Sequence, residues 1–369
     1  MMCSHSICSF RMLILVLFIT LSLQVVYAQN APKYSNEFLS IGVGARSLAM
    51  GKAVSASTED VMAGYWNPAG LTGIKDNIQI GYMHSAYWSG VANYDYAGLA
   101  VKLKNEDAFA LSMVRFGIDN IPNTFDLVRN GQIDFSRITA FSAVDYAFLL
   151  SYGHKSKIEG MSIGSSAKII HRKAGPWGTA LGFGLDAGIR YASPKKWYFS
   201  LMARDITTTF NAWSFSFSDK EKEILSQTGN EIPQNSMETT LPSFLLGAGK
   251  DIRIGKDFGL LAEVNLHITA DGQRNTLVSG DPFSIDPMMG VETKYKEMIF
   301  LRGGFGNLQQ SSLPDSDQTW VMEPNAGIGL KLKAFALDYA LSTIGKQATG
   351  NYTHVFSVKF SINKTEESK

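Results

Sequence analysis

The chain has 369 residues, and its 34 Lys and Arg against 33 Asp and Glu give a formal net charge of +1 at pH 7. A nearly neutral chain offers no electrostatic basis for binding nucleic acid. Its only two cysteines, Cys3 and Cys8, lie ahead of an apolar run, so the exported chain would have none. The composition therefore excludes a disulfide framework, a thiolate metal site and a cysteine nucleophile.

Residues 1–28 have the pattern of a secretory signal peptide. Arg11 precedes an apolar run from Met12 to Val26, and Val26-Tyr27-Ala28 supplies a small-residue cleavage site. The run is short for a transmembrane helix, which needs roughly 20 residues. We therefore expect export through a cleaved signal peptide, with the mature chain beginning near Gln29.

Residues 29–76 differ from the rest of the chain. Small residues dominate between Phe38 and Leu71, and polar and apolar side chains alternate poorly there. This composition predicts a compact plug or packing arm ahead of the first strand.

From residue 77 onward the chain is predicted to form strands. Between Leu181 and Tyr191 every second side chain is apolar, while the intervening positions are glycine, Asp186 or Arg190. Successive side chains of a strand point to opposite faces, and a tilted strand of about 9–11 residues crosses a bilayer. Similar patterns predict strands at 77–87, 94–104, 107–116, 139–153, 161–171, 179–192, 197–205, 242–252, 258–269, 287–295, 298–306, 325–332, 334–343 and 353–363.

The connections distinguish a membrane barrel from a soluble sandwich, which alternation alone does not. Turns after even-numbered strands are tight, as at Asn105-Glu106, while the connections after odd-numbered strands are mostly longer; the largest are 117–138, 206–241, 270–286 and 307–324. Outer-membrane barrels have short periplasmic turns and longer external loops, and a membrane sheet must close because unpaired backbone groups are costly in hydrocarbon. We predict an all-β fold, a transmembrane antiparallel β-barrel of about fourteen strands over 77–363 in the bacterial outer membrane, with 364–369 as a periplasmic tail.

An apolar face that meets lipid places the polar face inside the barrel. The residues predicted to face this lumen are Asp186, Arg190, Glu263, His267, Glu292, Arg302, Asp338 and Lys359. They either line a path or form paired interior charges, and we favour pairing. Aromatic residues near strand ends predict an interfacial girdle; they are Tyr87, Trp88, Tyr94, Tyr96, Tyr152, Tyr191, Trp197, Tyr198, Tyr295 and Tyr352.

The inner face is rich in glycine, at positions Gly182, Gly184, Gly188, Gly247, Gly249, Gly304, Gly306, Gly327 and Gly329. Glycine in a strand marks a bend or the close approach of another backbone. Two interpretations stay open: space for a plug or passenger, and curvature of the barrel.

Motifs that would carry chemistry are absent or misplaced. Gly160-Met-Ser-Ile-Gly164 matches the G-x-S-x-G motif of hydrolases, but it lies in a turn that leads into a strand, not in a strand-to-helix turn. The histidines share no zinc-ligand spacing. Asp271, Asp281 and Asp286 lie in or beside one loop and could hold calcium, but solvated loop charge is the favoured interpretation. We expect no catalytic, cofactor or metal site.

The N-terminal segment carries Gly42-Val-Gly-Ala-Arg46, Ala49-Met-Gly51 and Tyr65-Trp-Asn-Pro-Ala-Gly-Leu71. With these motifs the chain resembles the PorV/PorQ family of Bacteroidetes outer-membrane proteins, which is grouped with the FadL-type fourteen-stranded barrels. The resemblance implies that residues 29–76 enter the barrel as a hatch, with Asn67, Pro68, Ala69 and Gly70 as its structural motif. The ending His354 to Phe360 is also similar to the closing strand of PorV-like proteins.

Two functions are expected from this resemblance. The first is a role in, or related to, the type IX protein secretion system, in which long external loops, chiefly 207–240, would contact a translocon or exported cargo. The alternative is a FadL-type transporter or channel for hydrophobic small molecules. The expected partners are outer-membrane lipid and either secretion proteins or a hydrophobic small molecule, with no nucleic acid.

Overall fold

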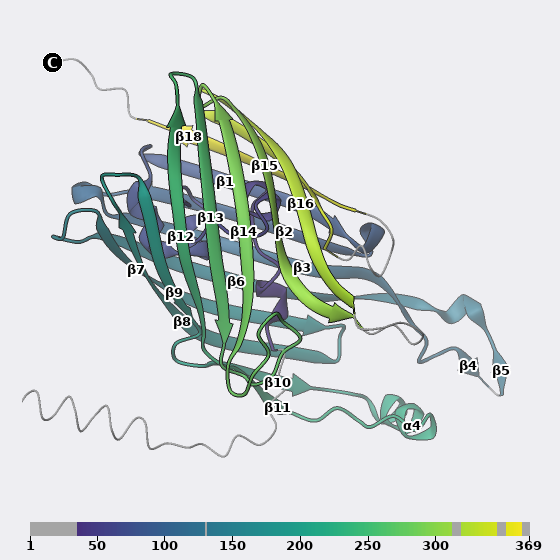
Figure 1. Cartoon of the computed structure of the whole chain (residues 1–369). Helices are drawn as coiled ribbons and strands as arrows, with labels where there is room; N and C mark the ends of the chain where they lie inside the picture. The colour runs from purple at the N-terminus through teal and green to yellow at the C-terminus, as the bar shows by residue number, and fades with distance from the viewer. Residues whose placement is uncertain (1–34, 130, 312–318, 345–351, 364–369) are drawn as a thin grey trace, which may run out of the picture. The chain divides into compact units, whose positions relative to one another are not determined.

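The computed structural model describes residues 35–129, 131–311, 319–344 and 352–363 (Figure 1). The predicted signal peptide and the predicted tail at 364–369 lie outside these residues. The barrel strands are β1 (Ile78–Tyr87), β2 (Ala92–Lys102), β3 (Ala108–Asn123), β6 (Thr139–Lys155), β7 (Met161–Ala174), β8 (Gly178–Ala192), β9 (Trp197–Arg204), β12 (Ser243–Ile254), β13 (Phe258–Thr269), β14 (Ser284–Tyr295), β15 (Ile299–Ser311), β16 (Thr319–Leu332), β17 (Phe335–Ser342) and β18 (Thr353–Ile362).

Each barrel strand pairs antiparallel with the next one along the chain, and β1 pairs with β18 to close the ring. The sheet has 16 strands, of which β10 (Thr209–Phe215) and β11 (Ser236–Thr240) lie outside the ring, so the barrel has fourteen. The predicted fold class is therefore confirmed, and every predicted strand has its counterpart. We call the two ends of the barrel the long-loop end and the short-turn end.

The long connections contain more structure than the sequence indicated. Residues 206–241 hold β10, helix α4 (Asp219–Gln227) and β11, and residues 117–138 hold the end of β3 and a small hairpin of β4 (Val128–Arg129) and β5 (Gln132–Ile133). Helix α4 begins at a capping box in which the Ser218 and Glu221 side chains bond each other's backbone nitrogens. Within the described ranges, no helix is long and apolar enough to span a bilayer.

The barrel wall forks at β8. Its second half, Ala187 to Ala192, pairs with β9, whereas its first half pairs with β10 from Gly178 to Phe183. Strands β10 and β11 therefore leave the ring at the long-loop end (Figure 1). The described part of the chain thus has a closed ring at one end and a two-stranded flap at the other.

Residues 37–74 pack against the inner side of the wall as a chain of short helical turns, which we call the hatch. Its elements are η1 (Glu37–Leu39), α2 (Ala45–Ala49), α3 (Ala63–Trp66) and η2 (Pro68–Gly73). Leu48, Met50 and Leu71 are at most 1% exposed. The core thus consists of the hatch and the inner face of the strands.

Several glycines of the wall lie directly against the hatch. A Cβ atom at Gly290 would lie 2.5 Å from the Met50 carbonyl oxygen, and one at Gly304 would lie 2.5 Å from the Gly51 nitrogen. A Cβ at Gly188 would overlap Asn67. In contrast, Gly182 and Gly184 face side chains of β10. Close approach of the hatch therefore accounts for Gly188 and Gly304, and side-chain packing within the wall accounts for Gly182 and Gly184, while curvature of the barrel stays a prediction.

The girdle prediction is wrong for Tyr198, which faces inward with the Arg190 guanidinium carbon 5.2 Å from its ring centre, and for three further tyrosines. Tyr87, Tyr94 and Tyr96 are fully buried on the inner face, where Tyr96 donates a hydrogen bond to the Val61 carbonyl oxygen of the hatch (3.0 Å). Neighbouring side chains of a strand point to opposite faces, so an error of one residue in the predicted strand places an aromatic residue on the wrong face. Tyr191, Trp197 and Tyr295 are exposed on the outer face, as the girdle requires.

Candidate functional site: the hatch and its two chambers

The Asn67-Pro68-Ala69-Gly70 motif attaches the hatch to the wall. Asn67 Oδ1 accepts a hydrogen bond from the Ala69 nitrogen (3.1 Å) and so caps η2, while Asn67 Nδ2 donates to the Ile189 carbonyl oxygen of β8 (3.2 Å). Pro68 is at the first helical position, where its missing N–H costs nothing. Gly70 has no room for a side chain beside the Thr58 carbonyl. The motif is buried and shapes the chain where the hatch meets the wall.

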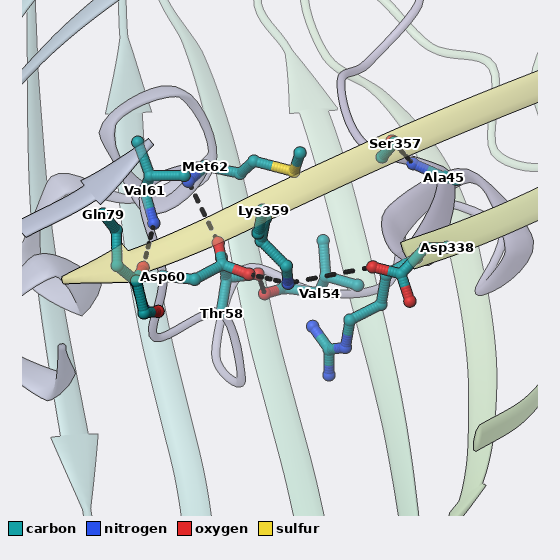
Figure 2. Close-up of polar contacts among 12 residues, drawn as sticks. Ala45, Val54, Thr58, Asp60, Val61, Met62, Gln79, Asp338, Ser357 and Lys359 are labelled. Carbon is teal, nitrogen blue, oxygen red and sulfur yellow. Dashed lines mark hydrogen bonds and ion pairs between the residues drawn. The ribbon is translucent and has the colours of Figure 1, made fainter. Parts of the chain in front are cut away.

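A network of ions joins the hatch to β14, β15, β17 and β18. Arg46 of the hatch pairs with Glu292 (2.9 Å), which also pairs with Arg302 (2.6 Å). Arg302 in turn pairs with Asp338 (2.7 Å). Figure 2 shows the other end of the network, where Lys359 pairs with Asp60 of the hatch (2.6 Å) and approaches Asp338 (3.8 Å). We call these six residues the hatch network.

The other predicted lumen residues have different partners. Arg190 donates to the Ala56 carbonyl oxygen (2.7 Å) and pairs with Glu59 of the hatch (2.5 Å), while Glu263 accepts from the Ala56 nitrogen (2.7 Å). Asp186 does not reach the hatch. It pairs with Lys168 of the neighbouring strand (2.8 Å), and Lys168 also pairs with Asp205 at the fork (2.6 Å).

Two cavities lie on opposite sides of the hatch. The long-loop chamber has a volume of about 610 Å³ and is lined by Lys52 and Trp66 of the hatch and by wall residues that include Arg204, His267 and Asp286. The short-turn chamber, of about 240 Å³, is lined by the hatch network and by Lys75 and Lys331. His267 thus belongs to a chamber wall and not to the hatch network. The hatch is the part of the chain that separates the two chambers.

A third cavity opens on the outside of the wall, at the fork. It has a volume of about 490 Å³. Its lining is mostly apolar and includes Ile169, Leu181, Phe183 and Phe210, together with Thr207 and Thr208 of the connection into β10. The departure of β10 from the ring therefore leaves an apolar notch in the outer surface.

The residues that the sequence analysis considered for catalysis or calcium binding make contacts within the fold instead. Ser162 of the G-x-S-x-G match is buried in β7 and shares a hydrogen bond with Thr72 of the hatch (2.8 Å). Asp271 pairs with Arg274, which also pairs with Glu37 (3.1 Å). Among the described residues, no cluster of three or more His, Cys, Asp or Glu side chains is arranged to hold a metal ion.

Sequence reasoning missed several residues of the site. Lys168 lies on the same face of β7 as Ser162 and Ser166, so the predicted strand at 161–171 contained the signal for its inward position. Arg204 and Lys52 carried no such signal. Arg204 lies at a strand end and stacks on Tyr65 and Trp66 of the hatch, with its guanidinium carbon 4.9 Å and 5.6 Å from the two rings. These contacts join residues far apart in the sequence and form only when the hatch has folded, so strand alternation does not predict them.

No protein-family model matches the chain, and no curated protein matches it either. Solved structures do match. The toluene transporter TodX of Pseudomonas putida aligns with a TM-score of 0.54 and 13% identity, over 88% of this chain and 99% of that one. The CymD monoaromatic hydrocarbon channel gives 0.53 and 12%, over 88% and 98%. The fold is that of the FadL-type barrels.

A FadL homologue of Pseudomonas aeruginosa also aligns, with a TM-score of 0.51 and 12% identity over 86% of this chain and 97% of that one. Identities this low establish the fold alone. The barrel fold that the resemblance implied is therefore confirmed. The narrower resemblance to PorV, with its type IX role, stays a prediction.

Acid is expected to loosen the hatch. The ionised carboxylate of Asp60 pairs with Lys359 of the wall, and protonation would remove the charge that makes this pair. Burial alone would raise the pKa of Asp60, but Lys359 and Arg46 outweigh burial and hold that pKa below its usual value. A depressed folded-state pKa contributes stability that is complete above the unfolded value of about 3.9 and is lost as the pH falls through the folded value. The conductance of the reconstituted barrel should therefore be constant from about pH 5 to 8 and rise below about pH 4.

The Asp60→Asn variant provides the matching test. At pH 7 this variant should conduct as strongly as the unchanged protein does in acid, because Lys359 loses its ion-pair partner in the hatch and Arg46 loses a nearby negative charge. Asp219→Asn, on the exposed first turn of α4, is the control and should behave as the unchanged protein. Equal conductance of Asp60→Asn and the unchanged protein at pH 7 would show that Asp60 does not retain the hatch.

Proposed function

We propose that this protein is an outer-membrane conduit for hydrophobic small molecules, gated by its hatch. The observation that carries the proposal is the pair of chambers, one toward each end of the barrel, separated by a single packed segment. A chamber of about 610 Å³ has the size of a small-molecule site. A purely adhesive barrel needs no such chamber.

The outer surface supports the membrane position. Large apolar side chains are exposed along the outward face of many strands, for example Leu181, Phe183, Leu301, Ile328 and Leu330, each at least 40% exposed. In water such a surface would be unfavourable, while in lipid it is the expected one. The solved structures of similar fold are described as toluene transporters and a monoaromatic hydrocarbon channel, which supports hydrocarbons as the first compounds to test.

The test is uptake by whole cells. Deleting the gene should lower the initial rate of radiolabelled toluene uptake severalfold, and restoring the gene should restore that rate. Uptake of a polar sugar is the control and should not change, because the proposed route takes hydrophobic molecules. Unchanged toluene uptake in the deletion strain would refute the conduit.

A second function is favoured by one observation at the long-loop end. The β4–β5 hairpin and the turn after it present Val128, Ile133 and Phe135, which are 61%, 63% and 73% exposed. Exposed apolar clusters mark protein contact sites. They support the proposal of a type IX-related role through contacts with a translocon or exported cargo. Under either proposal the protein acts without catalysis.

Affinity purification separates the two proposals. The intact protein and a Val128→Ser/Ile133→Ser/Phe135→Ser variant would be purified from native membranes. If the second function holds, secretion components or exported proteins co-purify with the intact protein and are lost from the variant. If the conduit alone is correct, neither preparation contains them.

A further inference from the structure

The outward face of β1, β2, β3 and β6 carries a row of polar side chains next to the apolar outward positions of the same strands. His84 is the register partner of Asp95, Asp95 of Arg115, and Arg115 of Tyr146. Each of these residues alternates with the buried positions of its strand and so points away from the lumen. We call these four residues the outward row.

Three residues of the outward row, His84, Asp95 and Arg115, form a connected network with Tyr82 and Asp119. Asp95 Oδ1 lies 2.7 Å from His84 Nδ1, and Asp95 Oδ2 lies 3.3 Å from a nitrogen of Arg115. The Tyr82 hydroxyl donates to Asp95 as well (3.2 Å). Arg115 is 3.5 Å from a second carboxylate, Asp119. The Asp95 and Arg115 side chains keep 17% and 23% of their surface exposed, so the network is partly open to a neighbour.

The row lies where the outward apolar stretch of these strands ends, with His84 and Asp95 each three residues from the long-loop ends of β1 and β2. On β3 the outward apolar positions are Phe109, Leu111 and Met113, and the next is Arg115. At about 3.3 Å per residue, the stretch from 109 to 113 is roughly 13 Å long. On β13 the outward positions are apolar from Phe258 to Ile268, roughly 33 Å. The lipid-facing apolar band of such barrels is about 25 Å tall.

The outward surface of β13 is therefore apolar over the whole height of the lipid band. The surface around the outward row is not, because polar side chains interrupt it. A charged side chain on the lipid face costs up to about 2–4 kcal/mol, depending on its depth. A protein surface with matching polar groups removes that cost. We propose that the face of β1, β2, β3 and β6 around the outward row is covered by a different membrane protein that presents a lysine or arginine to Asp95 and Asp119.

Charge decides between possible neighbours. With the histidines neutral, the network has two carboxylates, Asp95 and Asp119, and one guanidinium, Arg115, so it has a net charge of −1. A second copy of this chain docked by a two-fold axis would set this negative network against itself, which is unfavourable. The phosphate of a lipid headgroup is repelled in the same way. A cationic side chain on an unlike protein is complementary.

The proposal rests on the membrane position in the proposed function, and photo-crosslinking tests the two separately. A photoreactive phenylalanine analogue replaces Tyr82, beside the row, or Ile328, on the outward face of β16. The two positions are 46% and 49% exposed and lie equally far from the short-turn ends of their strands. The full-length protein is irradiated in its native membrane, and correct folding is checked by the shift in gel mobility on heating.

Position 82 should give a discrete adduct with another protein, crosslinked at a peptide that contains lysine or arginine, and position 328 should give lipid adducts only. Asp95→Asn with Asp119→Asn should lower the adduct at position 82 by about tenfold. Lipid adducts alone at position 82, an adduct with a second copy, or an adduct that survives both substitutions would overturn the proposal. Absence of lipid adducts at position 328 would instead refute the membrane position.

Discussion

Replacing Gly304 with leucine is expected to expel the hatch and open the barrel. Gly304 lies on the inner face of β15, where even a Cβ atom would be 2.5 Å from the Gly51 nitrogen. The obstacle is backbone, which cannot rotate away as a side chain can. The added side chain therefore excludes Met50 and Gly51 from their place, while β15 keeps its pairing with β14 and β16.

The expected result is a stable conductance in planar bilayers where the unchanged protein has none, together with sensitivity of cells to large antibiotics. Gly303→Leu is the matched control. Gly303 is the preceding residue and points outward, and the nearest atom to its Cβ would be 3.9 Å away. If both variants conduct alike, or if neither conducts, then close packing of the hatch against Gly304 is not what keeps the barrel closed.

Replacing Lys168 with methionine is expected to destabilise the barrel at the fork. Lys168 is 3% exposed and pairs with two carboxylates, Asp186 at 2.8 Å and Asp205 at 2.6 Å. Methionine keeps the length of the side chain but leaves two buried negative charges together. Removing one partner of a buried ion pair costs about 3–5 kcal/mol.

The measurement is the urea concentration at which the folded barrel, recognised by its gel mobility, is half lost. Lys168→Met should lower this midpoint strongly. Lys173→Met is the control, because Lys173 is exposed on the same strand. A midpoint unchanged by Lys168→Met, or lowered equally by Lys173→Met, would contradict the importance of the buried pair.

The strands were predictable because their physics is local. Alternation from Leu181 to Tyr191 and from Phe258 to Thr269 marks both the strand and the face that each side chain occupies. This placed Arg302 and Lys359 inside the barrel. Their pairing with Asp338 and Asp60 depends on contacts far apart in sequence, which alternation does not specify.

Other parts could not be predicted for the same reason. The flap of β10 and β11 arises where β8 changes partners, and nothing in its alternation marks the change at Phe183 to Ala187. The chambers depend on how the hatch folds against the wall. The outward row was readable as alternation on four strands, but its meaning needed the register that sets Asp95 beside Arg115.

The central claim is that molecules pass through the lumen when the hatch moves, and a reversible lock tests it most directly. Ser55 of the hatch and Ser200 of β9 have their hydroxyl oxygens 2.7 Å apart. Because the predicted mature chain has no cysteine, Ser55→Cys/Ser200→Cys would introduce a single possible disulfide, verified by counting free thiols. Oxidised cells should take up the hydrocarbon probe as slowly as deletion cells, and reduction should restore uptake. Equal uptake in the oxidised and reduced states would contradict a hatch-gated conduit.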